Sequence, residues 1–415
     1  GYPGAAMSDI SRRDLMKRGG MIAVGLTMPA WIARLAQADL VREARGQKPL
    51  SDRILVICQL SGGNDGLNTV VPFSDNRYYA ARPQLAIAES QVLPLDTRLG
   101  LHPSLGGMKT LYDEGKVAIV QNVGYPEPNR SHFKSMDIWH TASPEGTFST
   151  GWLGRHFDLQ LQSKPLNPVV ALGLSTEKPL ALNAKNASVP CFASLADIQQ
   201  LVGDPDAERR LRQIQGDAAA SGSAIRAVQD ASKTALDAMS ELEKRLGTYA
   251  PKEKYGTDAF GRGFQQISHL IGASPATKLV YFSAGGFDTH ARQPDAHANL
   301  LKGLGDGLLA FQREMEALGK ADQVLVLVFS EFGRRVHENN SMGTDHGAAA
   351  QMFLVGRGVK GGIHGNLPNL GDLNRGDLRH DVDFRQVYAT ALDEWLAGDS
   401  GVVLGSKFDH VPVLK

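Results

Sequence analysis

The sequence contains little cysteine and no excess of charge of either sign. Of its 415 residues only two are cysteines, and 44 basic residues are balanced by 44 acidic ones. Two cysteines cannot form a disulfide framework, and a chain without a basic excess is not expected to bind nucleic acid. Cys58 lies within the apolar run ILVICQL, and we therefore interpret it as a small core residue rather than a reactive thiol.

The sequence also has no apolar run that predicts a stable membrane span. The stretch GGMIAVGLTMPAWIA has about fifteen mostly apolar residues, whereas a spanning helix needs about twenty. It follows the paired Arg12 and Arg13 and precedes AQA at 36–38, an order that is typical of an export signal. The segment resembles a twin-arginine signal. This resemblance implies one partner, the twin-arginine export machinery, and a periplasmic or secreted mature protein.

We therefore expect three parts along the chain. Residues 1–38 would comprise a tag remnant, GYPGAA, and the signal peptide, so that the mature protein begins at about Asp39. Residues 39–50 would form a linker, and 51–415 would form one large α/β domain. The alternative for the N-terminal segment is a basic surface helix.

Short runs rich in Val, Ile and Leu recur along this domain. They lie at 54–60, 117–123, 168–172, 279–282, 324–329 and 352–355. Their continuous apolarity predicts strands that are buried on both faces, and hence a parallel sheet between layers of helices. Helical periodicity over 296–319, ending at Gly319, predicts one of these helices. The pattern as a whole predicts an open, doubly wound, mostly parallel α/β sheet.

One region interrupts this alternation. Residues 206–249 are rich in Ala, Arg, Glu, Gln and Leu, with SGS near the middle. We interpret this region as a helical hairpin, inserted into the domain at about 205–250. The hairpin would either face the substrate as a cap or serve as a plain packing layer.

Polar clusters follow four of the predicted strands. They contain Asn64 and Asp65; Arg130, Ser131 and His132; Asp288 and His290; and Glu331 and Arg334. The carboxyl ends of parallel strands meet at one edge of a sheet, where open α/β folds bind ligands, so we expect these side chains to share a site. Two of the clusters include a Gly-Gly pair, which lets the backbone turn sharply and approach a ligand.

Two pairs of residues in these loops predict a metal site. Asp288 and His290 would project from the same side of an extended chain, and Asp345 and His346 could complete the set. Nitrogen and oxygen ligands without thiolates favour Zn²⁺ or Mn²⁺ over Ca²⁺. The alternative for each pair is a capping aspartate beside a core histidine. The location of the pairs after strand ends favours the metal.

Several longer motifs carry a family resemblance. QLSGGNDGLNTVVPF, LHPSL, VGYPEPNRSHFKSMDIWH, SEFGRRVHENNSMGTDHG and GGIHG resemble the exported bacterial family catalogued as domain of unknown function 1501, over about residues 50–412. That family is grouped with the alkaline-phosphatase-like superfamily, which includes phosphatases and sulfatases. The grouping implies that fold for 51–415. It also implies a metal-dependent hydrolase of phosphate or sulfate esters, small or linked to a polymer, with one or two ions.

The resemblance also implies metal ligands. Asp65, with Asn64 as its rival, would be the metal ligand after the first strand. Asp288, His290 and His346 would hold one ion, although their first pair is spaced Asp-x-His rather than Asp-x-x-x-His. The ligands of the other ion are left open. By position they fall on Glu331 and Phe332, so that the histidine is missing; by motif they are Asp345 and His346, with His364 as the final ligand.

The implied chemistry begins with Ser131 as the nucleophile. Its hydroxyl, activated by a metal ion, would attack phosphorus or sulfur in line. Arg130 or Arg334 would balance charge on the equatorial oxygens, and His132 would protonate the leaving group. The alternative for His132 is an ordinary histidine in a loop, and the alternative for Arg334 is a solvated residue at the start of a helix.

A second hypothesis belongs to another class of protein. The chain would be a non-catalytic exported binding or assembly protein that kept the fold and lost the chemistry. The missing histidine at Phe332 supports this alternative.

Overall fold

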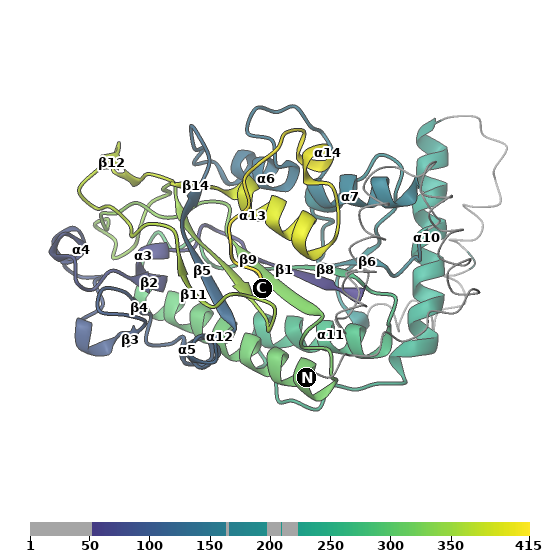
Figure 1. The fold of residues 1–415 in the computed structure, drawn as a ribbon, viewed down its shortest axis with the longest axis horizontal. Coiled ribbons are helices and arrows are strands. Elements are labelled where there is room, and N and C mark those ends of the chain that lie inside the picture. The colour runs from purple at the N-terminus through teal and green to yellow at the C-terminus, as the bar shows by residue number, and fades with distance from the viewer. Residues whose placement is uncertain (1–51, 163–165, 197–208, 210–222) are drawn as a thin grey trace, which may run out of the picture.

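The computed structural model of the protein describes residues 52–162, 166–196, 209 and 223–415. The expected signal peptide, the linker and the first helix of the expected hairpin lie outside these residues. The centre of the molecule is a nine-stranded sheet with helices on both faces (Figure 1).

The sheet is mostly parallel, as the sequence predicts. Its strands run in the order β11-β5-β10-β9-β1-β8-β6-β7, and β14 pairs with β5. They are β1 (Ile54–Leu60), β5 (Val117–Gly124), β6 (Ala171–Leu174), β7 (Cys191–Phe192), β8 (Leu279–Ala284), β9 (Val324–Phe329), β10 (Ala350–Val355), β11 (Gly362–His364) and β14 (Val382–Asp383). Each of the six apolar runs overlaps a strand. The run at 352–355 belongs to β10, which is antiparallel to both β5 and β9.

Helices cover both faces of the sheet because its strands are apolar on both sides. In β1, Val56 and Cys58 belong to one hydrophobic cluster, and Leu55 and Ile57 belong to the other. The first face is covered by α5 (Gly106–Asp113), α11 (Ala259–Ala273) and α12 (Gln293–Ala317). The other face is covered by α6 (His132–Thr141), α7 (Trp152–Leu161), α13 (Phe384–Thr390) and α14 (Ser400–Leu404) (Figure 1).

The predicted helix at 296–319 corresponds to α12. A proline lies in its first turn, and Gly319 follows its end with φ of +67°, which suits a glycine after a helix C-terminus. Of the expected hairpin, the second helix is α10 (Ser223–Leu246), which places Met239 and Leu242 in the core beside α11.

The remaining described elements are short. They are α3 (Gly66–Thr69), β2 (Val70–Val71), α4 (Asn76–Ala81), η2 (Glu89–Gln91), β3 (Leu93–Pro94), β4 (Gly100–Leu101), η3 (Leu180–Leu182), β12 (Leu373–Asn374), β13 (Asp377–Leu378) and the π-helical η4 (Ala391–Trp395). Strands β12 and β13 pair as an antiparallel hairpin. None of the helices in the described ranges is both long and apolar enough to cross a membrane.

Candidate metal centre

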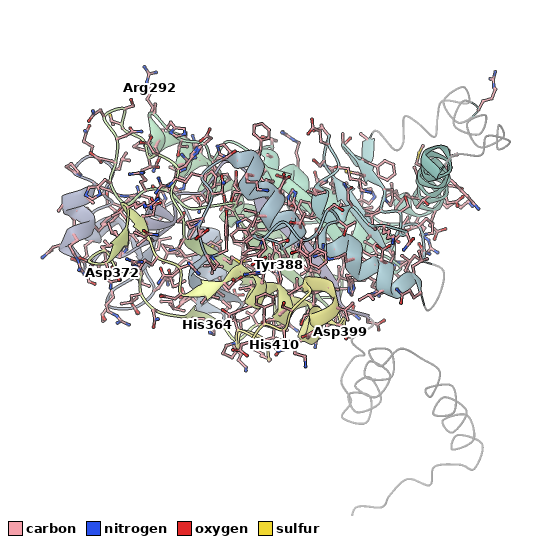
Figure 2. The ribbon with its side chains drawn as sticks, turned by 90° about the horizontal axis from the view of Figure 1, so that it is seen from above. Arg292, His364, Asp372, Tyr388, Asp399 and His410 are labelled. Atoms are coloured by element: carbon pink, nitrogen blue, oxygen red, sulfur yellow. The ribbon has the colours of Figure 1, made fainter. Side chains whose placement is uncertain are left out.

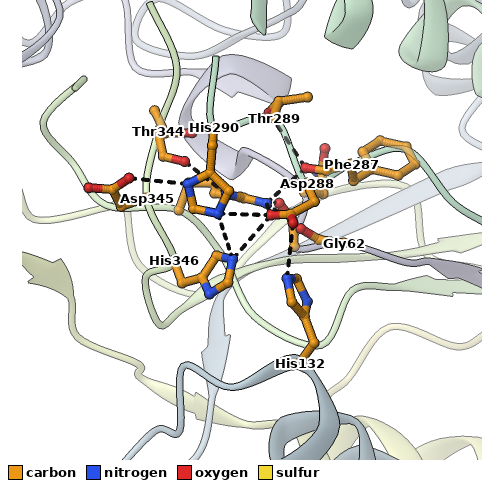
Figure 3. A network of polar contacts seen from close by, with 12 residues as sticks. Gly62, His132, Phe287, Asp288, Thr289, His290, Thr344, Asp345 and His346 are labelled. Atoms are coloured by element: carbon orange, nitrogen blue, oxygen red, sulfur yellow. Dashed lines mark hydrogen bonds and ion pairs between the residues drawn. The ribbon is translucent and has the colours of Figure 1, made fainter. Parts of the chain in front are cut away.

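Three histidines and one aspartate, from three parts of the chain, meet at the carboxyl edge of the sheet (Figure 3). Asp288 and His290 lie in the loop after β8, and His346 lies in the segment between β9 and β10. His132 is the first residue of α6, which follows β5. The structure therefore brings together three of the predicted metal ligands and adds His132 to them.

The Nε2 atoms of the three histidines converge on the carboxylate of Asp288. Those of His290 and His346 each lie 3.1 Å from Oδ1 of Asp288, and that of His132 lies 3.4 Å from Oδ2. The Nε2 atoms of His290 and His346 are 2.9 Å apart. All four side chains are partly exposed, so the group lies at the surface of the protein.

The other nitrogen of each ring contacts an oxygen acceptor. Nδ1 of His132 lies 2.9 Å from Glu331, Nδ1 of His290 lies 3.2 Å from Asp345, and Nδ1 of His346 lies 2.7 Å from the backbone carbonyl of Arg130. Carboxylate and carbonyl oxygens only accept hydrogen bonds, so each Nδ1 carries the proton in the neutral ring. Each Nε2 then presents a lone pair to Asp288.

This arrangement fits a bound cation. Three imidazole lone pairs around a carboxylate need positive charge between them, from protons or from a metal ion. Nε2 of His132 is buried and has no hydrogen-bond partner among the described residues. Imidazole ligands whose second nitrogen donates to an oxygen are usual at metal sites in proteins. His132, Asp288 and His346 could hold a metal ion together, and nitrogen and oxygen donors suit Zn²⁺ or Mn²⁺.

The pKa values at the centre favour an ionised Asp288 and a more basic His132. Partial burial by itself would raise the pKa of Asp288, but the hydrogen bond from Arg334 and the neighbouring imidazole of His346 lower it to about 2. The hydrogen bond to Glu331 raises the pKa of His132 above its usual range, although burial opposes this shift. Asp288 is therefore ionised at neutral pH, and the ring of His132 binds a proton more readily than an ordinary histidine does.

The family of the chain is shown by its sequence. Residues 96–399 match the family described as "Protein of unknown function (DUF1501)", and this range contains all four residues of the centre. The chain belongs to the DUF1501 family. No curated protein matches it.

Solved structures resemble this DUF1501 chain only distantly. Ps i-CgsB in complex with k-i-k-neocarrahexaose is 10% identical, with a TM-score of 0.35 over 86% of this chain and 73% of that one. The C-terminal periplasmic domain of EcEptC from Escherichia coli, in complex with Zn, is 8% identical, with a TM-score of 0.33 over 74% and 73%. The lipoteichoic acid synthase LtaP from Listeria monocytogenes is 8% identical, with a TM-score of 0.34 over 88% and 74%.

Arg334 holds the loops of the DUF1501 centre together. Its side chain is buried, so it is not a solvated helix start. The guanidinium donates to the backbone carbonyls of Gly62, Gly63, Phe287 and Thr344 and to Oδ1 of Asp288 at 2.7 Å. These contacts occupy the side chain, which leaves Arg334 to position Asp288 rather than a substrate.

Glycine is required where the loop after β1 passes under the centre. Gly62 has φ of +121°, and a Cβ atom there would lie 2.4 Å from the backbone nitrogen of Asp288. Gly63 has φ of +78°, and its Cβ would lie 2.3 Å from the ring of Phe332. The Gly-Gly pair therefore allows a close approach that any side chain would block.

Phe332 occupies the position where the resemblance placed a histidine ligand. Its buried ring packs against His132 with centroids 4.9 Å apart, and against His346 with centroids 4.7 Å apart. Phe332 thus supports two imidazoles from behind. Glu331, the residue before Phe332, is not part of the group around Asp288. It accepts hydrogen bonds from His132 and from the backbone N–H of Gly62.

Asp65 and Asn64 lie in a separate buried network. Both oxygens of Asp65 accept from Arg82, at 2.6 and 2.9 Å, and Oδ2 also accepts from Gln293 at 2.5 Å. Asn64 bonds to Thr69 and His297. Arg82 therefore supplies the positive charge that the resemblance assigned to a metal ion, and Asp65 is not among the residues around Asp288.

His364 and Asp345 also lie outside the group of ligands. His364 ends β11, and its Nε2 lies 2.8 Å from the backbone carbonyl of Lys360. Figure 2 shows His364 on the opposite side of the molecule from Arg292, which lies two residues after His290. Asp345 contacts Nδ1 of His290 and accepts from Asn339, so it orients the ring of His290.

The remaining predicted residues border the centre. Ser131 is the exposed N-cap residue of α6, and its side chain makes no capping hydrogen bond. Arg130 forms an ion pair with Asp377. Arg335 is half-buried, and the described residues give its guanidinium no hydrogen bond or ion pair, although its charge acts on Asp345 and Asp377.

Some of these functions had no signal in the sequence. His346 is oriented by a backbone carbonyl, which any residue at 130 would provide. The ion pair of Arg82 with Asp65 joins the C-terminal end of α4 to the loop after β1. No sequence motif indicates this pair. For His132, the one signal in the sequence is its position in the polar cluster that follows a predicted strand.

Proposed function

We propose that this protein is an exported, metal-dependent hydrolase of phosphate or sulfate esters. The observation that carries the proposal is the convergence of three imidazole Nε2 atoms on Asp288, with an outer oxygen acceptor behind each ring. The motifs resemble a family that is grouped with the alkaline-phosphatase-like superfamily, and this grouping supports the reaction class.

His132, His290, His346 and Asp288 would hold the ion. When bound, Zn²⁺ or Mn²⁺ polarises an ester oxygen and lowers the pKa of a nearby hydroxyl. Among the described residues, one group has ligand atoms close enough to hold a metal ion, and it consists of His132, Asp288 and His346. Asp65 is paired with Arg82. The proposal therefore requires a single ion.

Ser131 is the proposed nucleophile. An N-cap serine usually accepts from a backbone N–H of the first helical turn, but this one does not. Its backbone N–H donates to Asn129 at 2.9 Å, which fixes the residue beside His132. The bond from Oγ to phosphorus or sulfur would form while the bond to the leaving alcohol breaks. The serine proton would leave to solvent, the alcohol would depart with a proton from water, and a second water would cleave the seryl ester.

Charge on the transferred group would be balanced by the chain itself. The positive end of the ten-residue helix α6 lies at Ser131, and helix N-termini attract anions. Arg334 and Arg130 are both engaged by carboxylates. Arg335 has the guanidinium that remains available, and we assign it to the equatorial oxygens in place of Arg334.

Metal content and turnover test this proposal together. Purified protein loaded with Zn²⁺ or Mn²⁺ is expected to bind about one ion per chain and to hydrolyse members of a panel of phosphate and sulfate esters. Ser131→Ala is expected to lower kcat by about a thousandfold or more and to leave metal content unchanged. The matched control is Ser406→Ala, an exposed serine after α14. Equal turnover in both variants would remove the serine from the mechanism.

The same measurements distinguish the alternative of a non-catalytic binding protein. Stoichiometric metal without turnover of any ester would favour that alternative. Export is tested separately, by mass spectrometry of the protein from its native host. The proposal expects a terminus near Asp39, and an intact Met7 terminus would contradict it.

A further inference from the structure

A cavity of about 170 Å³ lies next to the candidate metal centre. Glu331 and Phe332, which contact the histidines of the centre, form part of its wall. Other parts of the wall come from the loop at 124–128, which leads to Ser131, and from the hairpin of β12 and β13. A molecule in this cavity would therefore lie beside the reacting group.

Two buried residues that line the cavity each have one polar atom without a partner. Nε1 of Trp139 is a hydrogen-bond donor, Oδ1 of Asp377 is an acceptor, and neither has a hydrogen-bond partner among the described residues. The two residues are 3% and 2% exposed. Buried indole N–H groups and carboxylate oxygens are almost always hydrogen-bonded in proteins.

The surroundings of Trp139 prevent the ring from turning to another partner. The indole stacks against Phe329, with centroids 5.2 Å apart, and against Phe384, with centroids 4.4 Å apart. Both rings are stacked nearly parallel to the indole, at 11° and 26°. The N–H group lies on the edge of the indole, which the stacked rings leave uncovered, and Trp139 is one of the residues that line the cavity.

The surroundings of Asp377 leave one of its oxygens without a donor. Arg130 donates from both Nε and Nη2 to the same oxygen, Oδ2. Burial raises the pKa of Asp377 although Arg130 opposes the shift. The carboxylate is thus charge-paired on one side and lacks a donor on the other.

We infer that this cavity binds a hydroxyl-bearing, uncharged ligand of the sugar or polyol class. A hydroxyl group can accept from the indole N–H and donate to the carboxylate with a single oxygen. The buried charged groups at the wall are already paired, Asp377 with Arg130 and Glu331 with His132. The two exposed ones, Glu127 and Arg379, have opposite charges, so the wall has no excess of charge for an ion to neutralise. Its volume exceeds that of one water, about 30 Å³, several times over.

The ligand would be the alcohol portion of the ester, an assignment that rests on the proposed function. The cavity would hold the sugar or polyol while the ester group lies at Ser131 and the metal centre. Binding of the free alcohol itself does not require that the metal centre be active.

Saturation-transfer NMR on the full chain, with and without Zn²⁺, tests the inference. The probes are glucose, galactose and myo-inositol, with acetamide as a probe that offers both donor and acceptor but no hydroxyl. At least one polyhydroxylated probe is expected to bind. Asp377→Asn and Trp139→Phe are each expected to weaken that binding about tenfold or more, because each removes a buried hydrogen bond.

Two control variants keep the test specific. Asp372→Asn removes an exposed carboxylate on the same hairpin segment, which pairs with Arg379 at 3.1 Å. Trp152→Phe alters another buried indole, stacked on Tyr388 with centroids 4.2 Å apart. Both are expected to leave probe binding unchanged. Thermal melting checks folding, and Asp377→Asn, which preserves side-chain shape, remains decisive if Trp139→Phe is unstable.

Three results would overturn the inference. The first is no binding of any polyhydroxylated probe at about 100 mM, a concentration about a thousandfold above a dissociation constant of 0.1 mM. The others are equal binding by the Asp377 and control variants, and binding of acetamide alone. A crystal structure soaked with the probes that shows only water between Trp139 and Asp377 would also overturn it. Sugar binding without ester hydrolysis would support the inference while the proposed function fails, so the two outcomes can be told apart.

Discussion

Nδ1 of His346 lies 2.7 Å from the backbone carbonyl oxygen of Arg130, the residue before Ser131. This contact joins a proposed metal ligand to the loop that carries the proposed nucleophile. Because the acceptor is a backbone atom, the orientation of the imidazole follows the path of the loop rather than any side chain. Metal binding and the position of Ser131 are therefore expected to depend on each other.

His346→Ala is expected to lower the affinity for Zn²⁺ by more than about 100-fold, because replacing an outer partner of a ligand alone typically costs 10- to 100-fold. Competition with a chelator measures the affinity. His364→Ala is the control, since His364 lies outside the group. Equal metal affinity in the two variants would mean that the ion does not bind at Asp288.

Glu331→Gln is expected to lower metal affinity by about 10- to 100-fold and to preserve the fold, because the variant weakens the acceptor behind His132 without removing a ligand. Glu394→Gln is a matched control. Glu394 also lies 2.9 Å from Nδ1 of a histidine, His410, but that pair is on the surface near the C-terminus. If the control lowers the affinity as much as Glu331→Gln does, the effect is not specific to the centre.

Asp65 is expected to stabilise the fold and not to bind metal. Burial would raise its pKa, but the pairing with Arg82 and the bond from Gln293 leave the pKa below its usual range. The unfolded chain therefore binds this proton more readily. The stabilisation is complete above the unfolded pKa, near 3.9, and is lost as pH falls through the lower folded pKa.

Urea unfolding between about pH 2.5 and pH 7 measures this effect. The wild type is expected to lose more stability below about pH 4 than Asp65→Asn does. Arg82→Met leaves Asp65 as a buried unpaired charge and is expected to cost about 3–5 kcal/mol at neutral pH. A loss of bound metal in Asp65→Asn would show instead that Asp65 is a ligand.

Gly62→Ala is expected to lower both the melting temperature and the metal affinity. The new Cβ atom would meet the backbone nitrogen of Asp288 at 2.4 Å, in a backbone conformation that L-residues rarely adopt. Gly285→Ala is the control, because a Cβ atom there would meet nothing within 4 Å. Thermal melting and metal titration of the two variants make the comparison, and similar losses in both would show that the approach of Gly62 to Asp288 is not important.

The sequence allowed the sheet to be predicted because its strands are buried on both faces. Runs such as ILVICQL and VLVLVF coincide with β1 and β9. The direction of β10 could not be predicted, because a buried run of the same composition can pair in either direction.

The candidate centre could be predicted in part for a related reason. Asp288, His290 and His346 follow strand ends, and the carboxyl edge gathers such residues. The functions of Asp65 and Arg334 could not be predicted, because they depend on which partner reaches each side chain. Arg82 comes from the end of α4, and Arg334 contacts carbonyls of three separate loops. Such pairings are set by tertiary packing and leave no local pattern.

The central claim is that one cation binds at Asp288 between three imidazoles. A crystal structure of the metal-loaded protein, with anomalous scattering measured at the zinc and manganese edges, tests it most directly. We expect one anomalous peak, from an ion that is bonded to Asp288 and to the Nε2 atoms of His132, His290 and His346. A structure without a peak there, or with the ion bound at Asp65 or His364, would contradict the account.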